Sequence, residues 1–157
     1  MSGESTVGDG EREREPGPGG TGAVYRIELR VVAPVRPTEV TDRVADAVEN
    51  LFPEADVVHE EGQVVGTGRS VEQFAALLRR QEILDTARER LLDGVRGDAI
   101  HVKLKKLAAF RGVVNFSVGS PDEVGDLAVR IRVEEPTVGA FVDAVAPPTA
   151  DGEPVTE

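Results

Sequence analysis

Apolar and polar residues alternate along four stretches of the chain, which is the pattern of a half-buried β-strand. The four stretches are residues 24–32, 100–105, 114–118 and 127–133. In the first of them Ile27, Leu29 and Val31 would face one side, and the polar residues between them would face the other. A hairpin of two shorter strands is predicted at residues 56–59 and 63–66, joined by Glu-Glu-Gly.

Three other stretches repeat apolar residues at spacings of three and four, which predicts amphipathic helices. The first follows Thr38 and ends before Pro53, and the last follows Pro136. The longest runs from Ser70 to Val95 as one continuous helix, with Ser70 and Gln73 as a capping box and Gly94 as its stop.

The order of elements is strand, helix, hairpin, long helix, three strands and short helix. Short connections after the long helix favour an antiparallel sheet, and alternation in each strand implies one covered face. We therefore expect an α+β fold, a two-layer sandwich with a mostly antiparallel sheet and the helices on one face. It would occupy residues 23–146 as a single domain, between a disordered acidic tail at 1–22 and a C-terminal tail at 147–157.

Composition narrows the class of protein further. The 157 residues include no cysteine, which excludes disulfides and thiolate metal sites, and 39% are hydrophobic. No apolar run reaches the roughly 20 residues of a membrane span, and no secretory signal is seen, so we expect a cytoplasmic protein. The net charge is −11, and only three of the 18 basic residues are lysines. This composition is typical of a halophilic protein, and at molar salt the Debye length is only about 3 Å, so local charge matters more than the total.

Basic residues gather on the polar side of the predicted strands. Those positions are Arg26, Arg30, His101, Lys103, Lys105, Asn115, Ser117, Arg130 and Arg132. Within residues 100–132 six basic residues stand against three acidic ones. The six are Lys103, Lys105, Lys106, Arg111, Arg130 and Arg132. Such a surface fits a phosphate backbone. The alternatives are a solvated face or cross-strand pairing with Glu28.

The kind of nucleic acid follows from what this surface lacks. Phe110 is the only aromatic residue that could stack on a base from an outward position. Contact with the backbone of structured RNA, independent of sequence, is therefore favoured over readout of bases.

Three polar residues fall on or beside the apolar stripe of the long helix, namely Gln81, Asp85 and Arg88. Their spacing of four and three would let them touch along one helix face. Because an unmet buried hydrogen bond costs roughly 1–3 kcal/mol, we expect a structural polar network at the edge of the core. A site that grips a ligand is the alternative.

Signals for catalysis are weak. His59 and His101 lie in different strands and have no metal-like neighbour at helical spacing. The loop 66–70 precedes a helix and could contact an anion, but it lacks the lysine of a phosphate-binding loop. We therefore expect no enzyme, no metal and no cofactor. An enzyme working through Gln81, Asp85 and Arg88 ranks last, since no nucleophile joins them.

Several motifs resemble an archaeal family of uncharacterised proteins that is grouped with predicted RNA-binding, exosome-subunit-like proteins. They are Leu-Leu-Arg-Arg-Gln-Glu-Ile-Leu-Asp-Thr-Ala-Arg at 77–88, Ala-Ala-Phe-Arg-Gly-Val-Val-Asn-Phe at 108–116, Val-Arg-Ile at 129–131, Val-Ala-Pro-Val-Arg-Pro-Thr-Glu and Asn-Leu-Phe-Pro. The resemblance covers residues 24–154 and implies the α+β sandwich of the ribosomal protein that contacts 5S RNA. Leu107 stands where that family typically has glutamine, and the acidic N-terminal extension also departs from the pattern.

An interaction module is the second hypothesis for function. The open sheet face would then pair with another copy as a homodimer. Ile83 points away from the apolar stripe of the predicted long helix, so it would mark such a contact.

Overall fold

The computed structural model describes residues 25–118, 125–150 and 153–154, so the predicted tail at 1–22 lies outside the described residues. Its elements are β2 (Arg26–Pro34), α2 (Thr41–Leu51), β3 (Asp56–Glu60), β4 (Gln63–Gly68), α3 (Glu72–Arg80), α4 (Leu84–Asp93), β5 (Val95–Arg96), β6 (Ala99–Lys105), α5 (Lys106–Ala109), β7 (Asp126–Glu135), α6 (Val138–Val145), β8 (Thr149–Ala150) and β9 (Glu153–Pro154).

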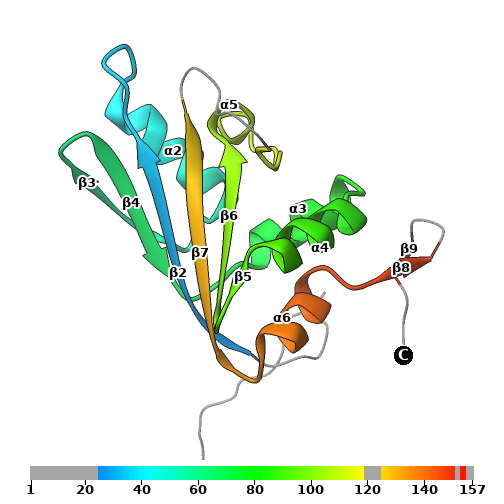
Figure 1. Cartoon of the computed structure of the whole chain (residues 1–157). Coiled ribbons are helices and arrows are strands. Elements are labelled where there is room, and N and C mark those ends of the chain that lie inside the picture. The colour runs from blue at the N-terminus through cyan, green and yellow to red at the C-terminus, as the bar shows by residue number, and fades with distance from the viewer. Residues whose placement is uncertain (1–24, 119–124, 151–152, 155–157) are drawn as a thin grey trace, which may run out of the picture.

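Six strands form one sheet in the order β3-β4-β2-β7-β6-β5, and every neighbouring pair is antiparallel. Figure 1 shows the sheet running from β3 to β5, with α2 behind the strands and the α3–α4 pair extending from the β5 side. The predicted α+β sandwich with an antiparallel sheet is therefore confirmed.

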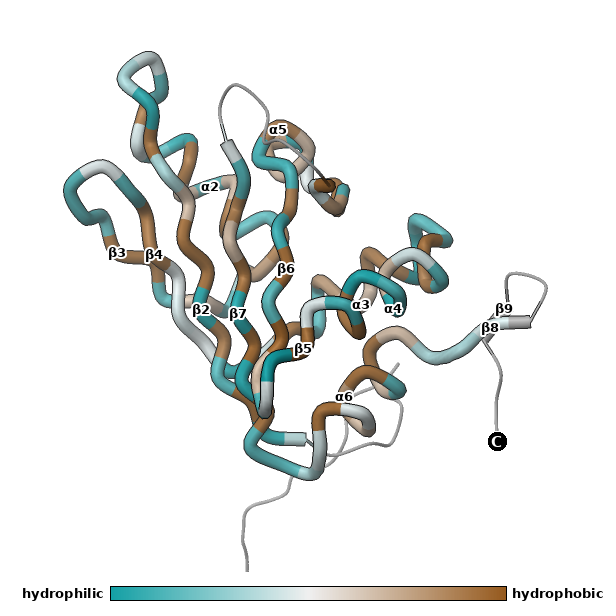
Figure 2. Tube along the Cα trace, in the orientation of Figure 1, coloured by the Kyte–Doolittle hydropathy of each residue, from teal (hydrophilic) through white to brown (hydrophobic). Residues whose placement is uncertain are grey.

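The alternating pattern decides which face of the sheet is covered. In β2 the residues Ile27, Leu29 and Val31 are buried, and the residues between them are exposed or half-buried. The same alternation holds in β6 and β7, whose buried residues join one core with the helices. It is visible in Figure 2 as brown and teal segments alternating along the strands. The polar side of β2, β7 and β6 is the side we call the open face.

The predicted long helix is wrong, because the chain breaks it into α3 and α4 at residues 81–83. Glu82 adopts a left-handed conformation with φ 60°. Its N–H bonds to Arg79 O, and the N–H of Ile83 bonds to Leu78 O. These two bonds form a Schellman motif that ends α3 with glutamate in the place usually held by glycine. Ile83 then packs against the core, so its apolar side chain has a partner within the chain.

Smaller differences occur around β6. Residues 95–96 form β5 rather than the end of a helix, and α5 replaces the predicted connection after Lys105. The predicted strand at 114–118 is reduced to one bridge between Leu104 and Phe116. At the C-terminal end, β8 and β9 pair as a short ribbon where a solvating tail was expected.

Candidate functional site

Two arginines and one histidine lie in one row across the middle of the open face. Arg130 of β7 is the register partner of Arg30 on β2 and of His101 on β6. Lys103 lies on the same side of β6, two residues further along the strand. The sequence predicted that these strands share a sheet, and the register places Arg30, Arg130 and His101 side by side.

This row is costly to the free protein. Like charges directly opposite each other in an antiparallel pair destabilise a sheet, and Arg30 faces Arg130. Within the described part of the chain, neither arginine makes an ion pair, and nor does Lys103. The arrangement leaves a positive field on this part of the open face.

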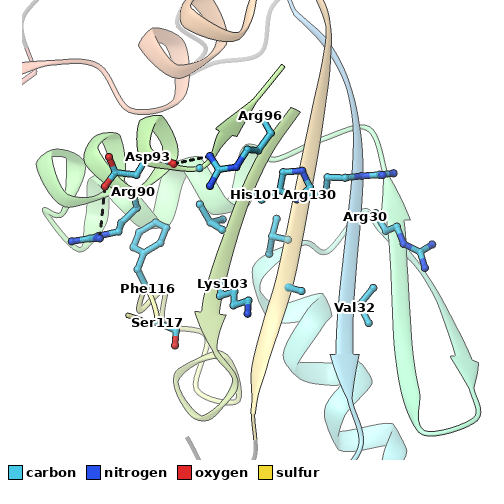
Figure 3. A pocket seen from close by; sticks show the side chains of 14 residues that line it. Arg30, Val32, Arg90, Asp93, Arg96, His101, Lys103, Phe116, Ser117 and Arg130 are labelled. Carbon is cyan, nitrogen blue, oxygen red and sulfur yellow. Dashed lines mark hydrogen bonds and ion pairs between the residues drawn. The ribbon is translucent and has the colours of Figure 1, made fainter. Parts of the chain in front are cut away.

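These cations line a groove of about 410 Å³ that also reaches the end of α4. Arg90, Asp93 and Arg96 contribute from α4 and β5 (Figure 3). Arg96 is anchored there, since its guanidinium donates to the carbonyl oxygens of Asp93 and Val95 at 3.1 and 2.8 Å. Asp93 is the one acidic residue among the described lining residues, and its carboxylate is 3.9 Å from the guanidinium of Arg90.

The groove forms because β6 has two different neighbours along its free edge. The N–H of His101 bonds to Gly94 O at 2.8 Å, and the N–H of Ser117 bonds to Lys103 O at 2.9 Å. Between these two contacts the edge of β6 opens into the groove, where Phe116 forms part of the wall. Val32 and Ala128 line it on the open face. The groove therefore combines an apolar wall with a cationic rim.

Arg132, a predicted phosphate contact, already has acidic partners. Its guanidinium lies 3.2 Å from Glu28 and 3.4 Å from Asp98. The hydrogen bond that Arg132 donates to Asp98 and the negative charge of Glu28 both raise the pKa of Arg132. This is the cross-strand pairing with Glu28 that the sequence left open as an alternative.

Lys106 corrects the sequence prediction most clearly. Its side chain has no exposed surface, because β6 ends at Lys105 and α5 turns the next residue inward. The ammonium group donates to the carbonyl of Pro34 and pairs with Glu39 at 2.8 Å. The prediction that Lys106 belongs to a surface for phosphates is therefore wrong.

Two further predicted cations lie outside the groove. Lys105 ends β6, where its register partner is Asp126. Arg111 is exposed in the turn after α5. Neither lines the groove.

Gln81, Asp85 and Arg88 do not contact one another as the long helix implied. The Gln81 amide donates to Val114 O and accepts from Val114 N, both at 2.9 Å. Asp85 accepts from Thr149. Arg88 donates to Asp143 at 2.8 Å and to Ala146 O at 3.1 Å. Each of the three ties the α3–α4 pair to a different segment, and none lines the groove.

Removing the amide of Gln81 tests its structural role. Gln81→Ala leaves both backbone groups of Val114 without their partner, so we expect the free energy of unfolding to fall by about 1–3 kcal/mol. Urea denaturation measures the loss. Gln73→Ala is the matched control on the same helix, because no described hydrogen bond involves its side chain. Equal effects of the two substitutions would contradict the role assigned to Gln81.

The described residues offer little else for chemistry. They contain no group of three or more histidine, aspartate and glutamate residues that could hold a metal ion. His59 lies 3.8 Å from Asp42. It belongs to β3 at one edge of the sheet, whereas His101 belongs to β6 near the other edge. None of the described helices has the length and apolar character that crossing a membrane requires.

Sequence reasoning missed Arg90, Asp93 and Arg96 as groove residues. It assigned all three to one long helix or the loop after it, and so gave them no relation to the sheet. The available signal was Gly94, which ends α4 and lets the chain turn directly onto β6.

The fold and the groove together define a class of protein. It is an α+β sandwich with an antiparallel sheet, and the open face of that sheet carries a cationic groove. A family model described as RNA binding matches residues 26–134. A UPF0201 protein of Aeropyrum pernix is 38% identical over 144 residues, covering 87% of this chain and 95% of that protein. The crystal structure of a UPF0201 protein from Methanococcus jannaschii matches with a TM-score of 0.76 and 34% identity, covering 82% of this chain and 99% of that chain.

The chain therefore belongs to the archaeal UPF0201 family. A UPF0200/UPF0201 protein of Archaeoglobus fulgidus is also 38% identical, over 136 residues. The match covers 83% of this chain but only 41% of that longer protein.

Proposed function

We propose that this protein is a non-catalytic RNA-binding module that holds the phosphate backbone in the groove of the open face. The observation that carries the proposal is the row of Arg30, Arg130 and His101, with Lys103 beside it. In a chain of net charge −11, a group of cations without acidic partners among the described residues is where a polyanion gains most.

The family model described as RNA binding supports the same proposal, since its residues 26–134 contain the whole groove. Absence of catalysis is proposed because the one hydroxyl side chain of the described lining, Ser117, donates to Asp126 at 3.0 Å and makes no described hydrogen bond to His101, the histidine of the same groove.

The cations retained in this proposal differ from those the sequence selected. Lys103 and Arg130 remain, and Arg30 and Arg96 join them from the groove lining. Arg132 is held by carboxylates and Lys106 is buried, so neither is assigned a phosphate.

A salt titration tests the proposal. The variant Arg30→Gln/Lys103→Gln/Arg130→Gln should bind a labelled single-stranded RNA more weakly than wild type. Because log K falls with log salt by about 0.7 per phosphate contact on single strands, the slope should become shallower by about 2. Fluorescence anisotropy over a range of KCl concentrations measures both quantities.

The matched control removes three exposed arginines from helices, in Arg43→Gln/Arg79→Gln/Arg80→Gln. Net charge changes equally in the two variants. The control should keep the wild-type slope. Equal slopes for wild type and both variants, or no RNA binding by wild type, would overturn the proposal. Loss of folding does not explain the expected result, because the groove variant removes a like-charge repulsion.

A further inference from the structure

The cationic area is too small for a long duplex. Arg30 and Arg130 also line a second groove on the β4 side, where the side chains turn acidic. The acidic residues of that groove are Glu28, Glu54 and Asp56. A double-stranded RNA-binding domain spans about 16 base pairs. A duplex laid across this face would bring phosphates onto these carboxylates.

The groove itself has two chemically different parts. On the open face it offers Arg30, Arg130 and Lys103, which suit a phosphate. At the β6 edge it offers Phe116, and Asp93 lines it at the end of α4 with its carboxylate turned toward Arg90 (Figure 3). A volume of about 410 Å³ lies in the range of pockets that hold a small organic molecule.

We propose that the groove binds one unpaired nucleotide of a single-stranded RNA. Its phosphate lies on Arg30 and Arg130, and its nucleoside enters the β6 edge between Phe116 and Asp93. This inference rests on the proposed function and adds the form of RNA that the site accepts.

Asp93 is the residue that distinguishes a nucleotide from a phosphate alone. A carboxylate repels phosphate, but it accepts hydrogen bonds from a ribose hydroxyl or from an exocyclic amino group. The side chain of Asp93 is 69% exposed, and Arg90 approaches it only to 3.9 Å. Its oxygens are therefore accessible to a nucleoside in the groove.

The first test compares two forms of the same RNA. A short fluorescein-labelled oligoribonucleotide of mixed sequence is titrated as a single strand and as a duplex with its complement, at one salt concentration. Phe116 is only 8% exposed, so its contact with a base should give no more than the lower end of the roughly 1–3 kcal/mol of a full stack, and the single strand should bind about five-fold more tightly. Equal affinities, or a tighter duplex, would overturn the inference.

The second test asks whether removing an acidic side chain weakens or strengthens RNA binding. Asp93→Ala should weaken binding of the single strand about ten-fold, because a hydrogen bond to a charged group is lost. Glu54→Ala removes an equal charge from the second groove, beside the same arginines, and should strengthen binding. If phosphates alone were bound, both variants would bind more tightly.

The two proposals fail differently. If RNA binding depends on salt and on the three groove cations, while Asp93→Ala binds more tightly and the duplex binds as well as the single strand, the proposed function stands and the nucleotide site is refuted. If wild type binds neither form, the proposed function fails, and the nucleotide site fails with it.

Discussion

Replacing Lys106 with methionine should lower the free energy of unfolding by about 3–5 kcal/mol. The substitution keeps most of the side-chain volume but leaves the carboxylate of Glu39 buried without its cation. That carboxylate already lacks one hydrogen-bond partner, because its Oε2 is buried with none in the described structure. Its other oxygen accepts from the N–H of Arg36 and from Lys106, both at 2.8 Å. The carbonyl of Pro34 would lose its donor as well. Urea denaturation measures the change.

The double variant Lys106→Met/Glu39→Leu distinguishes the effect of the ion pair from the effect of the packing around it. This variant has no buried charge without a partner, so we expect it to be more stable than Lys106→Met alone. A single variant that loses less than about 1 kcal/mol, or a double variant that is less stable than the single one, would contradict the burial of an intact ion pair at this position.

Gly94→Ala should cost about 3 kcal/mol, at the upper end of the usual effect of overpacking. A Cβ at this position would lie 2.0 Å from the carbonyl oxygen of His101 and 3.0 Å from its carbonyl carbon. Both atoms belong to the backbone of β6, so no side-chain rotation can make room. For a protein of this size the midpoint of thermal unfolding should fall by roughly 6–12 °C. Differential scanning calorimetry measures it.

Gly139→Ala is the control for that substitution. Gly139 is in α6, and a Cβ there meets nothing within 4 Å. Alanine is favoured over glycine in a helix by up to about 1 kcal/mol, so this variant should be as stable as wild type or more stable. A Gly94→Ala protein that unfolds at the wild-type temperature would show that α4 does not approach β6 as closely as described.

Alternation predicted the sheet well because each strand has one covered face. Ile27, Leu29 and Val31 are buried as expected, and Arg30 and Arg130 emerge on the opposite side. The strand order and register did not follow from the pattern. Arg30 faces Arg130 only because β2 and β7 are neighbours in the sheet. That pairing joins residues about a hundred positions apart in the chain, which a local pattern does not reveal.

The helix break escaped sequence reasoning for a local reason. Leu77, Leu78 and Leu84 continue the helical spacing across the turn, and no glycine or proline marks it. Glu82 adopts a left-handed conformation that glutamate rarely takes. The two backbone bonds of the Schellman motif and the packing of Ile83 and Gln81 against other segments offset that cost.

The burial of Lys106 was not predicted from the sequence for a different reason. Alternation assigns a side chain to a face only while the strand lasts, and the strand ends one residue earlier. From there α5 sets the direction of the side chain, and a lysine in a run of lysines gives no sign that one of them is buried. The groove at the β6 edge was also invisible, since it requires Gly94 and Ser117 to meet the same strand from different parts of the chain.

The two edges of the sheet also affect how the protein avoids aggregation. An edge strand with free backbone groups can recruit a strand from another molecule. At one side β3 has five residues, and Asp56 and Glu60 at its ends carry negative charge. At the other side, β5 and the segment around Phe116 occupy parts of the β6 edge. Strand-by-strand polymerisation is thus disfavoured at both edges of the sheet.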